Sequence, residues 1–523
     1  MTTSQDAELA AALGRTRKSY DDTPYVHAPM MRSHPGRLAA QAVWRGLAAP
    51  QAAKARVLEI GCASGGNVLP LAAALPDARF LGVDLSPVQI AAGEAHRKRY
   101  GIDNVELRAD SFEAIDSRDG EFDFIICHGV YSWIPEPLRE ALLGVISARL
   151  APDGVAMVSF NVLPGWRLFQ IARDSMLLNA RLIADPTQRA AKTRELFALL
   201  AAQSADKHSY GRFWRDEAQR MAAGGDAYLA HEIFEESNAP ETFADFTARA
   251  ARFDLEYLSE TVVVANNEED LAPDGAASIR ALAGDDRLKR ETYIDIFSGR
   301  SFREALLVRA GRVGPTAPPP PLERLHFIPA IDLEFKPDGD APDAFILAAG
   351  KTEIVARAPE AAASLRRLVE RRPRSSTLAD LMPEGELSPQ AGDALGQVLR
   401  AAVEAGLLAI STVPVDCATR LSERPRVWPF VAMDAAESER TVTIRHAAFQ
   451  LGPLQRLFAP LMDGTRTRGD LVAVALDMAT SGQLTIGGAD GPVTDPDALR
   501  DRLETATDTA LGGFLRHGLL VDV

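Results

Sequence analysis

The chain has 523 residues, too many for a single hydrophobic core, and this length predicts about three or four domains. It is 46% hydrophobic and 25% charged, as in ordinary globular proteins, and it contains no apolar run long enough to cross a bilayer. The formal net charge of −15 disfavours nonspecific binding to nucleic-acid phosphates.

A glycine-rich turn is the first informative element of the chain. Residues 57–66 predict a buried strand that ends in this turn, and residues 67–74 predict the helix that follows. Glycine permits positive φ, so the backbone of the turn can lie close to a ligand. The next apolar run, residues 80–83, ends at Asp84, whose carboxylate can accept both hydroxyls of a ribose. The turn and the acidic residue together indicate a doubly wound sheet that binds an adenosine-containing cofactor.

The charge of the turn narrows the choice of cofactor. Glu59 stands before the first glycine, where it would repel a pyrophosphate but suits a ligand that carries an ammonium group. The turn resembles motif I of the class I S-adenosylmethionine (SAM) methyltransferases, whose ligand is an amino acid joined to adenosine through a sulfonium. Ala63 replaces the usual second glycine, which is a mild departure from that motif.

Three more strands are expected further along the chain. Residues 104–110 predict the third strand, residues 121–128 a fully buried fourth, and residues 155–160 a fifth. Strands that alternate with helical segments predict parallel βαβ units, which bind ligands at the carboxyl edge of the sheet. In the methyltransferase pattern, the residue at the place of Asp110 hydrogen-bonds the adenine amino group.

A proline tract at residues 313–321 marks the clearest boundary, because it predicts a stiff, extended linker. Before it, the apolar spacing from about residue 168 predicts mostly helices. After it, a weak repeat covers residues 365–408 and 454–520. Each copy predicts a helix, a capped short helix, and a helix that ends in Gly-Leu-Leu before a strand. This order resembles two tandem winged-helix modules. Their third helices are poor in basic residues, which favours protein binding or packing over DNA binding.

Residues 18–312 resemble bacterial methyltransferases that bear a methyltransferase regulatory domain, a family that includes lysine methyltransferases of outer-membrane surface proteins. The matching segments are 20–25, 33–38, 58–67, 128–135, 164–166, 231–232, 238–240 and 293–303. The resemblance implies an α/β fold with a Rossmann-like seven-stranded sheet, then a helical domain and two α+β winged-helix-like modules. The expected divisions are a cofactor-covering segment (1–50), the SAM-binding core (51–167), the mostly helical regulatory domain with its return to the sheet (168–312), the linker (313–330) and the two modules (331–414 and 415–523).

The resemblance also implies a SAM site, with S-adenosylhomocysteine as the product. Its residues are expected in the turn, at the strand tips and in the N-terminal segment. They are Glu59, Gly61, Ala63, Gly65, Asn67, Asp84, Leu85, Gln89, Asp110, Ser111, His128, Tyr20, Tyr25, His34 and Arg37. In the alternative interpretation, residues 33–36 only begin a helix, with Ser33 as the N-cap.

The acceptor is expected at the tips of the fourth and fifth strands. A lysine acceptor must lose a proton before attack, and an apolar, aromatic channel favours the neutral amine. We expect Tyr131 and Trp133 to shape this channel, His128 or Tyr131 to act as a proton relay, and Asn161 and Trp166 to complete the site. Alternatively, the tryptophans only pack against the sheet edge and His128 holds the loop or faces the cofactor.

The cysteines and the N-terminus indicate the compartment. Cys62, Cys127 and Cys417 cannot form a disulfide framework and lack the spacing of metal ligands. The first residues lack the charged and apolar blocks of a signal peptide. We therefore expect a reduced, cytoplasmic protein without a metal, a nucleic-acid partner or membrane insertion.

Three functions are compatible with these patterns. The favoured one is a protein lysine N-methyltransferase that acts on a bacterial surface protein, and the long helical insert is compatible with a homodimer. The second is a methyltransferase for a small molecule or glycan. The third is a SAM-binding regulatory or scaffold protein whose winged helices are the working part.

Overall fold

The architecture is taken from a computed structural model. It describes the whole chain except residues 1–2, 23, 25–27, 186–187, 204–207, 224–230, 236, 264–270, 272–273, 315–317, 340, 342–343, 358, 383–388, 489–490, 494 and 523.

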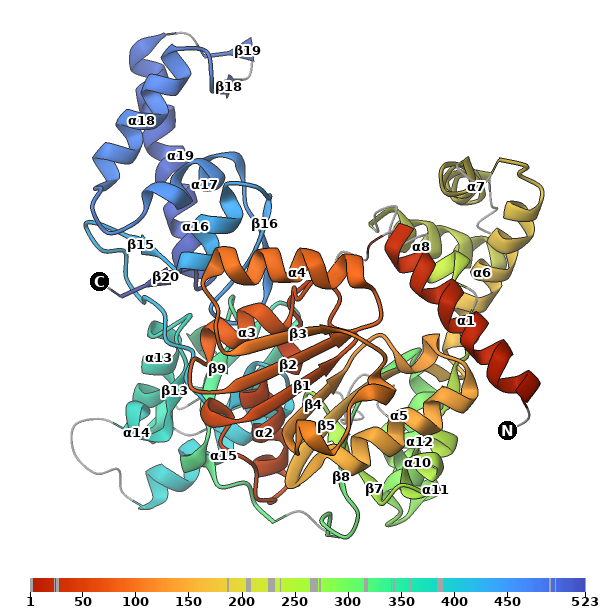
Figure 1. Ribbon diagram of the computed structural model, residues 1–523. Coiled ribbons are helices and arrows are strands. Elements are labelled where there is room, and N and C mark those ends of the chain that lie inside the picture. The colour runs from red at the N-terminus through yellow and green to blue at the C-terminus, as the bar shows by residue number, and fades with distance from the viewer. Residues whose placement is uncertain are drawn as a thin grey trace.

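A twisted sheet forms the centre of the part of the chain that precedes the proline tract (Figure 1). Its strands are β1 (Arg56–Ile60), β2 (Arg79–Asp84), β3 (Val105–Ala109), β4 (Phe122–Cys127), β5 (Leu150–Leu163), β7 (Leu255–Glu260) and β8 (Phe302–Arg309), with the short β6 (Glu241–Thr242) paired to β5. The order is β3-β2-β1-β4-β5-β8-β7, in which the first five strands run parallel and β8 is antiparallel to both neighbours. This order confirms the predicted seven-stranded, Rossmann-like sheet.

Helices cover both faces of the sheet because each strand alternates its apolar side chains between them. Val57 packs with one face and Leu58 with the other, as do Phe124 and Ile125. The first face carries α2 (Pro35–Trp44), α3 (Val68–Ala74) and α4 (Pro87–Tyr100), and the second carries α5 (Glu136–Arg149) and α10 (Phe243–Ala251).

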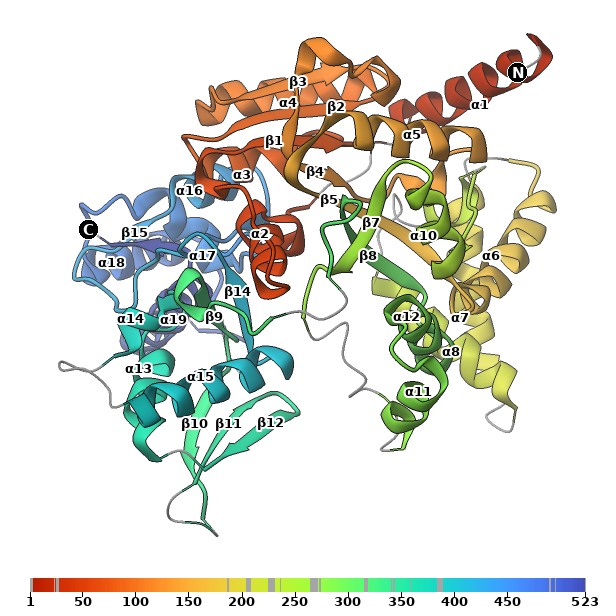
Figure 2. The same cartoon turned by 90° about the horizontal axis from the view of Figure 1, so that it is seen from below.

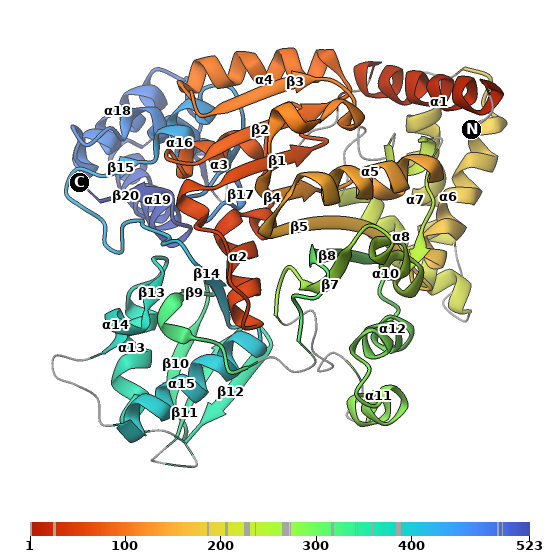
Figure 3. The same ribbon diagram turned by 60° about the horizontal axis from the view of Figure 1, so that its bottom comes forward.

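The regulatory region places a helical cluster beside the sheet, and the chain then returns to the sheet through β7 and β8. The helices are α6 (Trp166–Arg181), α7 (Arg189–Gln203), α8 (Ser209–Ala223), α11 (Gly275–Ala283) and α12 (Arg287–Ser298). The N-terminal helix α1 (Thr3–Asp22) lies next to α6 and α8 in Figures 1 and 3, far along the chain from both.

Two smaller modules lie on the other side of the sheet from α6–α8, as Figures 2 and 3 show. The first contains β9 (His326–Pro329), β10 (Glu334–Pro337), β11 (Phe345–Ala349), β12 (Thr352–Ala356), α13 (Ala362–Glu370), β13 (Ser376–Thr377), α14 (Leu378–Leu381), α15 (Pro389–Glu404) and β14 (Leu408–Ser411). The second contains β15 (Arg426–Val427), α16 (Pro429–Ala435), β16 (Arg440–Val442), β17 (Ala448–Gln450), α17 (Pro453–Phe458), α18 (Arg468–Thr480), β18 (Gly487–Gly488), β19 (Gly491–Pro492), α19 (Pro496–Arg516) and β20 (Leu520–Val521). The first module has the expected order of helix, capped short helix, helix and strand, whereas in the second the middle helix, α18, has 13 residues and is not short.

The first module begins earlier than expected. Strand β9 lies within the segment assigned to the linker, yet it pairs with both β13 and β14. Hydrogen bonds across the sheet therefore make β9 part of the module.

The modules contact the catalytic core directly. The Tyr100 ring of α4 stacks on Phe430 of α16 with centroids 4.2 Å apart, and the Thr412 N–H donates to the Gly36 carbonyl of α2 at 2.9 Å. Within the described residues, no helix is both long and apolar enough to cross a membrane.

Candidate active site

A cavity of about 400 Å³ lies at the carboxyl ends of β1 to β5. This is the edge where the sheet topology predicts a ligand. Of the residues predicted to form the site, those that line the cavity are Tyr20, Gly61, Ala63, Asp84, Leu85, Gln89, Asp110, Ser111, His128, Trp133, Asn161 and Trp166.

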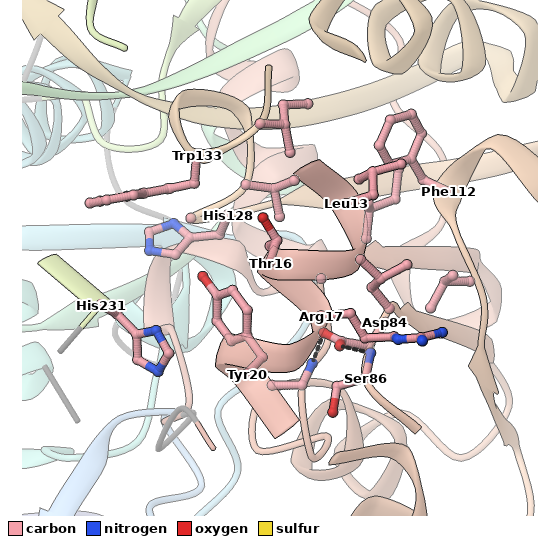
Figure 4. Close-up of a pocket in the computed structure, with 18 of the residues that line it drawn as sticks. Leu13, Thr16, Arg17, Tyr20, Asp84, Ser86, Phe112, His128, Trp133 and His231 are labelled. Carbon is pink, nitrogen blue, oxygen red and sulfur yellow. Dashed lines mark hydrogen bonds between the residues drawn. The ribbon is translucent and has the colours of Figure 1, made fainter. Parts of the chain in front are cut away.

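The carboxylate of Asp84 is held in place by the backbone (Figure 4). One oxygen accepts the Ala63 N–H at 2.8 Å and the other accepts the Ser86 N–H at 2.9 Å. A carboxylate has about four lone-pair positions, so both oxygens retain capacity for ligand hydroxyls. Burial raises the pKa of Asp84, and the two N–H donors oppose that effect.

The turn approaches the cavity closely because its backbone adopts left-handed conformations. Gly61 has φ +78°, and a Cβ there would lie 2.5 Å from a methyl carbon of Val130. Ala63 also has positive φ, at 48°. Glycine is therefore required at position 61, and the backbone rather than side chains forms this wall.

Three residues predicted to bind the cofactor lie behind this wall. Glu59, Gly65 and Asn67 are not among the lining residues. The Asn67 amide donates to Glu59 Oε1 at 3.1 Å, and its oxygen accepts the Met30 N–H at 2.8 Å. Burial raises the pKa of Glu59 to about 8. These side chains hold the turn from its inner side.

The opposite end of the cavity is aromatic. Trp133, His128 and His231 lie on one side of it in Figure 4, away from Asp84 and Phe112. The His128 ring packs edge-on against Phe302, with centroids 5.7 Å apart, and burial lowers its pKa. His128 is therefore neutral near pH 7.

Two polar groups complete this end. The Trp166 indole N–H donates to Asn238 Oδ1 at 3.1 Å, which fixes the ring. The Asn161 Nδ2 is buried and has no hydrogen-bond partner among the residues that the structure describes. An unpaired buried donor is costly, so this amide is well suited to a ligand acceptor.

The structure corrects the expectation for Tyr131. Its side chain is fully buried and packs against Phe246, and its hydroxyl donates to Glu241 Oε2 at 3.2 Å, under the guanidinium of Arg139. Burial raises the pKa of Tyr131 above its usual value. Tyr131 therefore anchors the loop from the core side and lines no part of the cavity.

His34 and Arg37 do not reach this cavity either, contrary to expectation. Both lie in the first turn of α2 or just before it and line a second cavity. The N-cap of α2 is His34, not Ser33, because His34 Nδ1 accepts the Gly36 N–H at 3.1 Å. Tyr25 lies outside the described residues.

Helix α1 covers the site and supplies residues that no motif marked. Leu13, Thr16 and Arg17 line the cavity together with Tyr20, and the Tyr20 ring stacks on His231 with centroids 4.5 Å apart. Hydrogen bonds fix the helix at both sides: Ser86 Oγ donates to Asp21 at 2.5 Å, and Ser19 Oγ donates to Glu235 at 3.1 Å. The other lining residues not predicted are Ile60, Val83, Ser86, Phe112, Gly129, Val130, Ile134, Pro135, Glu232, Ser301 and Phe302. Several of these residues lie in segments that match the family pattern, namely 128–135, 231–232 and 293–303.

Three segments of the chain match known protein families. Residues 57–154 match the family described as "Methyltransferase domain", residues 225–309 the "Predicted methyltransferase regulatory domain", and residues 423–519 the "PKMT, C-terminal winged helix domain". These matches confirm the resemblance identified in the sequence.

Relatives of this chain occur in Rickettsia. An uncharacterized protein of Rickettsia prowazekii is 34% identical over 289 residues, which is 55% of this chain and 52% of that protein. A second uncharacterized protein of that organism is 32% identical over 235 residues, 45% of this chain and 94% of the relative. The match thus spans about half the length of the first relative and nearly all of the second.

The structure of PKMT2 from Rickettsia typhi in complex with AdoHcy has the same fold. It superposes with a TM-score of 0.82, covers 95% of this chain and 100% of its own, and is 24% identical in sequence. The similarity therefore extends over the catalytic core, the regulatory region and both C-terminal modules.

Proposed function

The chain belongs to the class I SAM-dependent methyltransferases that carry a methyltransferase regulatory domain, and we propose that it methylates lysine side chains of a bacterial protein. The observation that carries this proposal is the two-ended cavity, with Asp84 at one end and Trp133, His128 and His231 at the other. The match of residues 423–519 to a PKMT domain supports a protein lysine acceptor.

The acidic end fits the cofactor. Asp84 has acceptor capacity for the ribose hydroxyls, and the proposal assigns the adenine amino group to Asp110, which lines the same cavity. When bound, SAM supplies an electrophilic methyl group: its sulfonium S–C bond breaks as the lysine N–C bond forms, which leaves S-adenosylhomocysteine. The turn at Gly61 has no side chain to block this ligand.

The aromatic end fits a lysine side chain. Trp133, Trp166 and Phe302 offer apolar surface to its methylene stem, and this surface disfavours the charged ammonium. Neutral His128 can accept a hydrogen bond from the amine or take its proton, and Asn161 can orient the nearby polar groups. Helix α1 forms part of the cavity wall and so limits the access of water, which favours transfer to the amine over competing reactions.

The acceptor class is tested by the destination of the methyl group. The full chain is incubated with methyl-labelled SAM and a bacterial surface extract, and label is measured separately in protein, glycan and small molecules. The proposal expects label in the protein fraction, strongly reduced with the Asp84→Asn variant. Label confined to glycans or small molecules would overturn it.

The homodimer remains a prediction. Light scattering at micromolar protein concentration tests it.

A further inference from the structure

A second cavity of about 400 Å³ lies between the catalytic core and the C-terminal modules. Its walls come from α2, the end of α3, β9, the segment after β14 and the start of α16. Figures 1 and 3 both show these elements gathered where the modules meet the core. Among the described residues, none lines both this cavity and the candidate active site.

Two buried arginines line this cavity. Arg37 is 6% exposed and Arg445 is 8% exposed. Arg445 donates one N–H to the Pro329 carbonyl at 2.8 Å. Arg37 Nη2 and Arg445 Nη1 are buried without a hydrogen-bond partner in the described part of the chain. Buried charges in proteins are normally paired, so these two guanidiniums lack a counter-charge.

Nearby groups do not supply that counter-charge. Asp416 also lines the cavity, but its carboxylate pairs with Arg374 at 2.9 Å. His34 is neutral, because burial lowers its pKa to about 3. Burial and the proximity of Arg445 also lower the pKa of Arg37 to about 9. Arginine side chains stay protonated near pH 7, so the guanidiniums of Arg37 and Arg445 repel each other.

We propose that this cavity binds a small organic anion whose carboxylate or phosphate oxygens accept the unpaired N–H groups of Arg37 and Arg445. Guanidinium groups present several donors in a plane and suit either head group. The remaining wall includes Val413, Trp428 and Ile444, which suits an apolar body on the anion. The site is separate from the proposed methyl transfer and does not depend on it.

The position of the site connects it with the cofactor turn. His446 follows Arg445, and its Nε2 lies 2.7 Å from Asn67 Oδ1. Asn67 comes directly after the turn and bonds Glu59, which lies behind the cavity wall. An anion bound between Arg37 and Arg445 therefore bridges the two parts of the protein. Arg445 is next in sequence to His446, whose contact with Asn67 supports the cofactor turn.

Calorimetry on the purified full chain tests the site with phenyl phosphate and benzoate as probes. Benzyl alcohol is the uncharged control, at matched ionic strength in chloride. We expect at least one anion to bind, benzyl alcohol to bind at least about tenfold more weakly, and the stronger anion to identify the preferred head group. Heats that do not differ between the anions and benzyl alcohol would overturn the proposal.

Variants locate the binding. Arg37→Met and Arg445→Met keep the apolar stem, and each should weaken anion binding at least about tenfold. Arg440→Met, at an exposed position of the same module that does not line the cavity, should leave binding unchanged. Equal affinity in wild type and in a folded Arg37→Met or Arg445→Met variant would overturn the assignment. If neither variant folds, the comparison of the anions with benzyl alcohol on the wild-type protein decides the question.

Discussion

The carboxylate of Asp84 offers a sharp test of the cofactor site. Its two oxygens accept the Ala63 and Ser86 N–H groups at 2.8 and 2.9 Å and also face the cavity. In Asp84→Asn, an NH₂ group replaces one oxygen and confronts a backbone donor. One N–H then loses its acceptor, and the ribose hydroxyls lose part of theirs.

The expected loss follows from the number of contacts. An unsatisfied donor costs about 1–3 kcal/mol, and about 1.4 kcal/mol corresponds to a tenfold change in affinity. We therefore expect Asp84→Asn to weaken S-adenosylhomocysteine binding by roughly 10- to 100-fold, measured by calorimetry.

Asp123 supplies a matched control. Its carboxylate accepts the Arg56 N–H at 2.8 Å at the beginning of β1, and it does not line the cavity. Asp123→Asn makes the same chemical change at the other end of the strands and should leave the affinity nearly unchanged. An unchanged affinity in Asp84→Asn, or an equal loss in Asp123→Asn, would refute the reasoning.

Three further predictions concern residues in and around the site. Tyr131→Phe removes the hydrogen bond to Glu241 and should lower the free energy of unfolding by about 1 kcal/mol in urea titrations. The pH profile of kcat for this variant should match that of the wild type. Loss of one limb of the profile would instead indicate that Tyr131 is a proton relay. The pKa of Glu59 is about 8 in the folded protein and near 4.5 when the chain is unfolded. Between these pH values the folded state binds one more proton than the unfolded state, so the free energy of unfolding falls as pH rises through this range. Glu59→Gln should lack this decline in denaturation series, and an identical slope in both proteins would contradict the burial argument. Trp166→Phe loses the hydrogen bond to Asn238 and should raise KM for the protein acceptor several-fold without changing S-adenosylhomocysteine affinity. A loss of cofactor affinity alone would instead assign Trp166 to the cofactor end of the cavity.

The central sheet could be predicted from the sequence because its signals are local. Each strand is an apolar run with a polar tip, and the turn at Gly61 and the acid at Asp84 belong to adjacent units of the sheet. Strand ends of parallel units meet at one edge, so these residues were expected to lie together. Their place at one cavity follows from the topology.

The orientation of Tyr131 could not be predicted in the same way. Tyr131 and Trp133 lie in one short helical turn, yet the first enters the core and the second lines the cavity. The choice depends on Glu241, 110 positions away. Spacing alone does not distinguish the two sides of such a turn.

His34 and Arg37 show the effect of still more distant contacts. Arg37 was expected at the cofactor, but it lines the second cavity, where Arg445 and the second module complete its surroundings. The contact between Asn67 and His446 spans 379 positions. The residues of α1 were missed for a related reason, because docking against His231 and Ser86 decides which of its side chains reach the cavity.

The most direct test of the proposed activity is tandem mass spectrometry of proteins incubated with the full chain and methyl-deuterated SAM. Asp84→Asn serves as the parallel sample. The account predicts deuterated methyl groups on lysine side-chain nitrogens with the wild type, and a strong reduction with the variant. Formation of S-adenosylhomocysteine with the methyl label found on no lysine would contradict it.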